Sequence, residues 1–266
     1  MRERLDQALV SRQLVASRSR ARDLIGRGHV TVDGSITLKP AQTVRPDSAI
    51  GVDADAANQV SRGAVKLAAA LEAFSFSPED RRALDVGAAT GGFTQTLLQA
   101  GAMSVDAVDV GRGQMHLTLE NDPRVRVFEA TDIRTFSADV LKAHSNSGSS
   151  VSPKTRGASA DHFAAIVCDV SFISLLKVLP AILPLAAPNA WLVALIKPQF
   201  EVGKKHIGRG GIVRNEEAAR SAVETIENWF CEQPGWRITG IIPSPICGAD
   251  GNRETLLGAE RAAVQD

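Results

Sequence analysis

The stretch Leu84-Asp85-Val86-Gly87-Ala88-Ala89-Thr90-Gly91-Gly92-Phe93-Thr94 decides the fold of this 266-residue chain. It predicts, in order, a buried strand, a turn of small residues and the start of a helix. A turn of this kind lets a ligand approach the backbone closely at the carboxyl end of a parallel sheet. The turn alone does not identify the ligand, and a nicotinamide cofactor is a fair first interpretation.

Apolar bursts alternate with helical stretches on both sides of this turn. From residue 61 onward the alternation predicts a doubly wound, Rossmann-like α/β sheet. We expect its strands at residues 83–86, 105–109, 125–129, 163–169, 191–197, 237–242 and 254–258. The Ser-rich segment 145–159 interrupts the pattern, and we expect a mobile surface loop there with no catalytic role.

The amino-terminal part differs from the rest in charge and in pattern. Between Met1 and Arg45, nine Lys and Arg residues outnumber four acidic ones and leave a net charge of +5, although the whole chain is neutral. The pattern predicts two helices, the second with Ser17 as N-cap, and then a strand that runs into an Asp33-Gly34 turn. A basic module suggests binding to a polyanion, although a solvated basic helix would carry the same charge.

This helix–helix–hairpin pattern resembles the S4 RNA-binding domain, a small α+β fold. The resemblance rests on Arg4-Leu5-Asp6, Leu9-Val10, Ser17-Arg18, Leu24-Ile25, Val32-Asp33-Gly34 and Lys39-Pro40. It implies contacts with the phosphates and the shape of structured RNA. The arginines expected on the RNA face are Arg4, Arg18, Arg20, Arg22 and Arg27. We therefore expect an S4-like domain at 1–53, a small and polar linker at 54–60 and a larger domain at 61–266.

Two acidic residues in the larger domain narrow the choice of ligand. Asp109 ends the second expected strand, where a carboxylate can bind ribose hydroxyls, and Asp132 follows the third, where it can accept from an adenine amino group. The chain has no G-x-x-x-x-G-K-[ST] motif, which counts against nucleoside triphosphates. S-adenosylmethionine fits these features better, with Asp85 near its amino-acid end.

Lys66, Asp169, Lys197 and Glu254 are the candidate catalytic residues. Asp169 and Lys197 end apolar runs that predict strands, and Glu254 begins another such run. Each residue alone has an ordinary explanation as a solvated, capping or edge charge. Two lysines and two carboxylates that converge at strand ends would suit the removal of a proton from a weakly acidic hydroxyl.

Residues 61 to about 258 resemble the FtsJ-like ribose 2′-O-methyltransferases, whose signature contains a D-x-G-A-x-x-G-G-[WF] turn and a Lys-Asp-Lys-Glu tetrad. With the S4-like piece in front, the whole chain resembles the TlyA family of ribosomal RNA 2′-O-methyltransferases, which also carry the name haemolysin. The runs Ser-Arg-Gly-Ala at 61–64, Asp-Val-Ser-Phe-Ile-Ser at 169–174 and Lys-Pro-Gln-Phe-Glu-Val-Gly-Lys at 197–204 carry this resemblance. It implies a cytidine ribose in ribosomal RNA or ribosomal subunits as the substrate. The cofactor contacts expected are Asp85, Gly87, Gly91, Phe93, Asp109 and Asp132.

A ribose 2′-hydroxyl must lose its proton as the methyl group arrives, and Lys197 is the expected base. An ordinary lysine is protonated at neutral pH, so positive charge from Lys66 and the cofactor, together with burial, must favour the neutral amine. Asp169 favours the ammonium, so we expect it to orient a lysine, while Glu254 holds Lys66 or the ribose. Lys204, Lys205 and Arg209 lie in a Gly-rich segment, and we expect a flexible lid there that closes over RNA phosphate.

Several other classes of protein are disfavoured. The three cysteines have no paired spacing and His206 has no partner at ligand spacing, so we expect no metal site. The uncharged residues 178–196 contain three prolines and predict a helix, a Pro188-Asn189 turn and a buried strand, not a membrane span. We expect a cytoplasmic protein without a signal peptide or an obligate protein partner. Base methylation, a non-catalytic ribosome-assembly role and membrane lysis stay open as alternatives.

Overall fold

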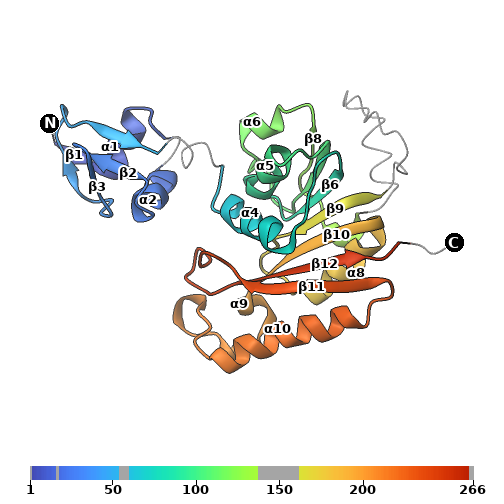
Figure 1. Ribbon diagram of the computed structural model, residues 1–266. Helices are drawn as coiled ribbons and strands as arrows, with labels where there is room; N and C mark the ends of the chain where they lie inside the picture. Colours follow the sequence, from blue (N-terminus) through green and yellow to red (C-terminus); the bar gives the residue numbers. More distant parts are fainter. Residues whose placement is uncertain (1, 16–17, 54–59, 137–161, 264–266) are drawn as a thin grey trace. The chain divides into compact units, whose positions relative to one another are not determined.

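The computed structural model describes residues 2–15, 18–53, 60–136 and 162–263 (Figure 1). The chain divides into two compact units, Met1–Val60 and Ser61–Asp266, and each unit has its own apolar core. The expected N-cap Ser17, nearly all of the expected linker and the whole Ser-rich segment lie outside the described residues.

The amino-terminal unit has the helix–helix–hairpin order that its sequence predicts. Helices α1 (Leu5–Ser11) and α2 (Arg18–Gly26) pack on a three-stranded antiparallel sheet in the order β3 (Ser35–Ile36), β2 (Val30–Val32) and β5 (Ile50–Val52). A two-stranded ladder joins β1 (Glu3–Arg4) to β4 (Thr43–Val44). Asp33 and Gly34 both have positive φ, as a tight hairpin turn requires.

The larger unit contains one seven-stranded sheet in the order β11-β12-β10-β9-β6-β7-β8. Its strands are β6 (Arg82–Val86), β7 (Ser104–Val108), β8 (Val125–Phe128), β9 (Phe163–Cys168), β10 (Ala186–Ile196), β11 (Trp236–Pro243) and β12 (Thr255–Arg261). The five strands from β10 to β8 are parallel, and β12 runs antiparallel to both of its neighbours. All seven expected strands are present, and the doubly wound α/β prediction is confirmed.

Side chains alternate between the two faces of this sheet, and helices cover both faces. Leu84 and Val86 join the large apolar core that α8 (Leu179–Ile182) and α10 (Glu216–Cys231) complete. The intervening Asp85 points to the opposite face and contacts α5 (Gly92–Gln99). Figure 1 shows α4 (Gly63–Phe74) and α10 on opposite sides of β11 and β12. Shorter helical segments are α6 (Leu117–Glu120), α9 (Pro198–Glu201), η1 (Ile133–Thr135), η2 (Leu175–Lys177), η3 (Leu183–Leu185), η4 (Lys204–His206) and η5 (Arg209–Gly211).

The expected turn at Pro188-Asn189 lies inside a strand and not before it. Strand β10 begins earlier, at Ala186, and contains both residues at a register shift between Ala186 and Trp191. Asn189 has a φ of 58°, and the chain bends there. The strand stays in the sheet, because Ala186 before the bend and Trp191 after it both pair with β9. No helix in the described part of the chain is long and apolar enough to cross a membrane.

The order of the strands places the functional residues. From β6 the chain adds β7 and β8 on one side of the sheet and then returns to add β9 and β10 on the other. The loops that follow β6 and β9 therefore run in opposite directions and leave a crevice between them. The Gly-rich turn follows β6, Asp109 follows β7, Asp169 follows β9 and Lys197 follows β10. Four of the predicted site regions therefore meet at one edge of the sheet.

Candidate active site

The turn after β6 depends on two glycines. Gly87 has a φ of 83°, and a Cβ atom there would lie 2.5 Å from the backbone oxygen of Asp169. Gly91 has a φ of 93°, and a Cβ atom there would collide with the side chains of Met115 and Leu119. The glycines thus allow the turn to touch the end of β9 and to start α5 without strain.

A cavity of about 590 Å³ opens at the carboxyl ends of β6, β7 and β9. Its walls combine backbone of the Gly-rich turn with apolar side chains such as Val110, Ile133 and Ile173. The carboxylate of Asp109 stands in this wall and accepts hydrogen bonds from the backbone N–H groups of Ala89, at 2.9 Å, and Gly111, at 2.6 Å. Each carboxylate oxygen keeps a further lone pair, which suits ribose hydroxyls.

The charges in this cavity indicate a ligand without phosphates. Among the described residues that line it, Arg134 is the one cationic side chain. The Arg134 guanidinium is already paired with Asp132, at 3.0 Å from Nε to each carboxylate oxygen, and it lowers the pKa of that carboxyl. The space, the apolar walls and the acidic groups therefore fit a nucleoside without phosphates better than a nucleotide.

The expected cofactor residues divide into two groups. Gly87, Asp109 and Asp132 line the large cavity, and Gly87 and Phe93 line a smaller one of about 140 Å³ beside it. Asp85 and Gly91 line neither cavity. They shape the turn from beneath, which differs from the direct contact that the sequence led us to expect.

Asp85 is fully buried under the turn. The hydroxyl of Thr94 donates to Asp85 Oδ2 at 2.6 Å. Burial raises the pKa of Asp85 to about 7, the Thr94 hydrogen bond opposes this shift, and the negative charge of Asp169 adds to it. The carboxyl therefore changes its charge near neutral pH, directly below the Gly-rich turn.

Replacing Asp85 with Asn should change how stability depends on pH. A carboxyl whose pKa is higher in the folded state stabilises the fold below its unfolded pKa, and this contribution is lost as pH rises to about 7. The wild type should therefore lose up to about 4 kcal/mol relative to Asp85→Asn between pH 4 and pH 8. Urea unfolding of both proteins across this range measures the difference, and parallel stability curves would refute it.

The four candidate catalytic residues form two ion pairs. Lys66, on α4, pairs with Glu254, just before β12, and both side chains are buried. Lys197 Nζ lies 2.6 Å from Asp169 Oδ1 and donates a hydrogen bond of 2.9 Å to Ser171 Oγ. Asp169 and Ser171 thus fix the direction of the Lys197 side chain.

These two ion pairs meet at a second cavity of about 350 Å³, the catalytic cavity. Lys66, Lys197 and Glu254 all line it. Asp169 instead lines the large cavity and, with Lys197, the small one. Ser171 lines all three cavities, so the large cavity and the catalytic cavity are neighbours that share a wall.

Comparison with known proteins agrees with this geometry. Residues 59–261 match the model of the FtsJ-like methyltransferases, and residues 3–50 match the S4 domain. The chain belongs to the FtsJ-like methyltransferase family. The 16S/23S rRNA (cytidine-2′-O)-methyltransferase TlyA of Mycobacterium tuberculosis is 43% identical over 258 residues, which cover 96% of this chain and 89% of that protein.

Two further relatives extend the similarity. The 23S rRNA (cytidine-2′-O)-methyltransferase TlyA of Campylobacter jejuni is 32% identical over 92% of this chain and 94% of its own length. A solved structure from Streptococcus thermophilus, which carries a provisional hemolysin name, has a TM-score of 0.70 at 34% identity and covers 98% of this chain and 89% of that one. The family that the sequence resembles is therefore confirmed.

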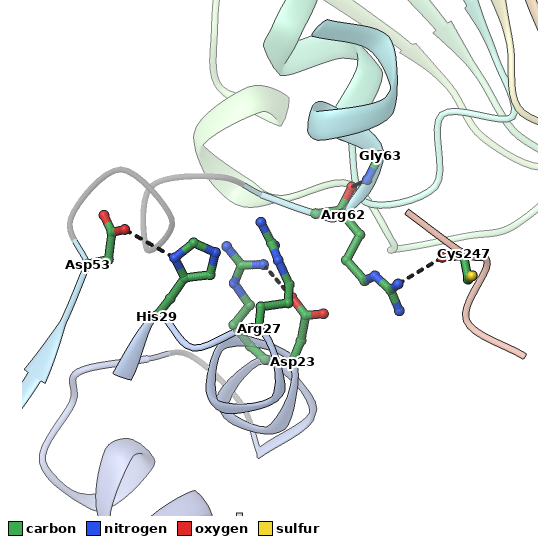
Figure 2. A network of polar contacts seen from close by, with 9 residues as sticks. Asp23, Arg27, His29, Asp53, Arg62, Gly63 and Cys247 are labelled. Carbon is green, nitrogen blue, oxygen red and sulfur yellow. Dashed lines mark hydrogen bonds and ion pairs between the residues drawn. The ribbon is translucent and has the colours of Figure 1, made fainter. Parts of the chain in front are cut away.

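The methyltransferase site also contains two residues of the family-like runs to which the sequence assigned no role. Phe172 is 92% exposed, has a φ of 65°, and its ring lies 5.2 Å from that of Phe200. Arg62 lines the catalytic cavity, and its guanidinium donates to the carbonyl of Cys247 at 2.8 Å (Figure 2). Ordinary strand and helix patterns carry no signal for either residue, because both lie in irregular segments.

Asn252 anchors the carboxyl end of the basic segment 203–211. Asn252, which is buried, accepts from the Val213 N–H at 2.9 Å and donates to the Gly211 carbonyl at 3.0 Å. Lys204, Lys205 and Arg209 are exposed, and none of them lines the catalytic cavity. Contact with RNA phosphate and closure over the ribose both stay predictions.

The arginines of the S4 domain surround two carboxylates. Arg4, Arg18 and Arg22 lie 2.9–3.1 Å from the buried carboxylate of Asp6, and together they lower its pKa. Their side chains stay about half exposed, so three cations over one anion leave a positive surface. Arg20 and Arg27 instead pair with Asp23, each at 3.4 Å, and Figure 2 shows the Arg27 contact beside the His29–Asp53 pair. We expect the Asp6 cluster to be the stronger phosphate-binding surface.

The described residues contain no group of three or more His, Cys, Asp or Glu side chains that could hold a metal ion. Cys168 is buried, which raises the pKa of its thiol, whereas Cys231 and Cys247 are exposed. The catalytic cavity thus presents lysines and carboxylates as its charged groups, together with Arg62.

Proposed function

We propose that this methyltransferase transfers a methyl group from S-adenosylmethionine to a ribose 2′-hydroxyl of ribosomal RNA, with cytidine as the target nucleoside. The observation that carries the proposal is the wall that the large cavity shares with the catalytic cavity, where the two lysine–carboxylate pairs meet. The names of the Mycobacterium and Campylobacter relatives describe this same reaction. Ribosomal RNA or ribosomal subunits would be its partner, in the cytoplasm.

The residues of the large cavity fit the proposed cofactor. Asp109 would accept from the ribose hydroxyls, and Val110 and Ile133 would enclose the adenine ring. The small cavity at Gly87 and Phe93 would hold the amino-acid end. When bound, S-adenosylmethionine supplies a methyl group on a positively charged sulfur.

Lys197 would act as the base at the wall between the cavities. Its neutral amine would accept the proton of the 2′-hydroxyl while the ribose oxygen bonds to the methyl carbon, whose bond to sulfur would break and leave a neutral thioether. Asp169 and Ser171 would aim the amine, because both contact Nζ. The Lys66–Glu254 pair is neutral as a whole and would hold the ribose through whichever atoms of the pair face the cavity.

The exposed ring of Phe172 supports an RNA substrate. Proteins that act on a nucleotide within RNA stack the unpaired base on aromatic side chains. Phe172 lines both the large cavity and the catalytic cavity, and its ring is backed by Phe200. A base stacked there would bring its own ribose to the catalytic cavity, while Arg62 at its edge could meet a phosphate.

One experiment tests this function against its alternatives. The protein is incubated with isotopically labelled S-adenosylmethionine and separated small or large ribosomal subunits, and the product RNA is cleaved with alkali. A 2′-O-methyl group blocks cleavage at its own nucleotide, so a labelled and uncleaved site supports the proposal. Label without a block would indicate base methylation, and cofactor binding without any transfer would indicate an assembly role.

The basic segment should strengthen RNA binding through charge alone. Replacing Lys204, Lys205 and Arg209 together with Ala should weaken RNA binding and reduce the salt dependence of log Kd by about 0.7–0.9 for each phosphate that the protein no longer neutralises. The rate of transfer at saturating RNA should stay close to that of the wild type. Filter binding at several salt concentrations measures the slope, with Arg237→Ala on the edge strand β11 as the control. An unchanged slope would remove this segment from the RNA interface.

A further inference from the structure

Glu201 joins the two chain segments that carry the reacting groups. It ends α9, four residues after Lys197, and is partly buried. Its carboxylate accepts a hydrogen bond from Ser174 Oγ at 2.6 Å and another from the Leu175 N–H at 2.8 Å. Burial raises the pKa of Glu201, whereas these two hydrogen bonds oppose the shift.

The segment that Glu201 holds is the one that follows β9, residues 169–175. It contributes Asp169 and Ser171, which both contact the Lys197 amine. The same segment meets α9 a second time, through the rings of Phe172 and Phe200. The Lys197 amine, the ring pair and the Glu201 carboxylate therefore all bind residues 169–175 to residues 197–201, and Glu201 lies farthest along both segments from the amine.

This segment needs such support because its backbone is strained. Phe172 has a φ of 65°, a left-handed conformation that costs an L-residue roughly 1–2 kcal/mol. Its ring is 92% exposed, so burial of the ring cannot offset this cost. The hydrogen bonds at Ser174 and Leu175 lie just beyond the strained residue and are placed to hold it.

We propose that Glu201 is a positioning residue that sets the rate of methyl transfer by holding Ser171 against the Lys197 amine. The proposal rests on the proposed function, since it assumes that Lys197 is the base. Glu201 lines none of the three cavities of the site: the large cavity, the small cavity or the catalytic cavity. It would therefore act without touching cofactor or ribose. Loss of its carboxylate would release residues 171–174 and leave the amine without one of its two guides.

Replacing Glu201 with Ala tests this directly. At saturating cofactor and RNA the single-turnover rate should fall about 10- to 100-fold, as expected for a misaligned reacting group, while RNA affinity changes little. Glu201→Gln, which keeps the shape and one acceptor oxygen, should restore part of the rate and serves if the alanine variant does not fold. The control is Glu224→Ala, which removes an exposed carboxylate from α10 and should keep the wild-type rate.

A double-substitution cycle separates positioning from general damage. Ser171→Ala removes the hydroxyl that Glu201 is proposed to place, so the Glu201 substitution should have little further effect on the rate in that background. The same fold-loss in both backgrounds would overturn the proposal. A wild-type rate in Glu201→Ala, beside an inactive Lys197→Ala, would also overturn it and leave the proposed function intact. Turnover by Lys197→Ala at the wild-type rate would instead refute Lys197 as the base, and the labelled-subunit experiment above tests the methyl transfer itself.

Discussion

Replacing Lys197 with Ala is expected to lower the rate of methyl transfer by about 10²- to 10⁴-fold, the usual contribution of a general base. Its amine contacts both Asp169 and Ser171, at the wall between the two cavities. Without it, the 2′-hydroxyl loses the amine that is proposed to accept its proton. Transfer of labelled methyl to RNA measures the loss, and calorimetry with S-adenosylmethionine should show that cofactor binding persists.

Two further variants make this result specific. Lys197→Arg keeps the positive charge and the ion pair with Asp169 but cannot act as a base, because guanidinium does not lose its proton in proteins. It should therefore be as inactive as the alanine variant. Lys177→Ala removes an exposed lysine outside the site and should keep the wild-type rate. Activity in Lys197→Arg would show that charge, not proton transfer, is what position 197 supplies.

The strands and the meeting of Asp169 with Lys197 were predictable because they depend on short-range patterns. Apolar runs such as residues 163–168 are long enough to be buried strands, and residues that end parallel strands meet at one edge of a sheet. This is why Asp169 and Lys197, which are 28 positions apart in sequence, could be expected in one site. The pairing of Lys66 with Glu254 was harder to predict, since it depends on how α4 packs beside β12.

Other features depend on three-dimensional contacts that no local pattern encodes. The sequence predicts a place for Asp85 near the amino-acid end of the cofactor, but the alternation of β6 turns its side chain under the turn, toward Thr94. The exposure of Phe172 and the two hydrogen bonds to Glu201 arise in an irregular segment, where spacing predicts nothing. Asn252 likewise donates a hydrogen bond to the carbonyl of Gly211, 41 residues earlier in the chain. The glycines of the segment 203–211 do not predict this contact.

Replacing Gly87 with Ala should abolish both cofactor binding and catalysis. An alanine at a φ of 83° is strained, and its Cβ would lie 2.5 Å from the Asp169 carbonyl oxygen and 2.9 Å from the carbonyl carbon. These are backbone atoms, so the end of β9 must move, and the Asp169 carboxylate moves with it. We expect the free energy of unfolding to fall by roughly 2–5 kcal/mol, from the left-handed conformation and the overpacking together.

Gly235→Ala provides a matched control for this effect. Gly235 has a similar φ of 74°, but no atom lies within 4 Å of the position that its Cβ would occupy. It should therefore carry the conformational cost without the collision, and it lies outside the site. The difference between the two variants in urea unfolding isolates the contact between the turn and Asp169. Normal binding of S-adenosylmethionine by Gly87→Ala, together with the stability of Gly235→Ala, would contradict this expectation. That result would show that the close approach of the turn to Asp169 does not fix the large cavity relative to the Asp169–Lys197 pair.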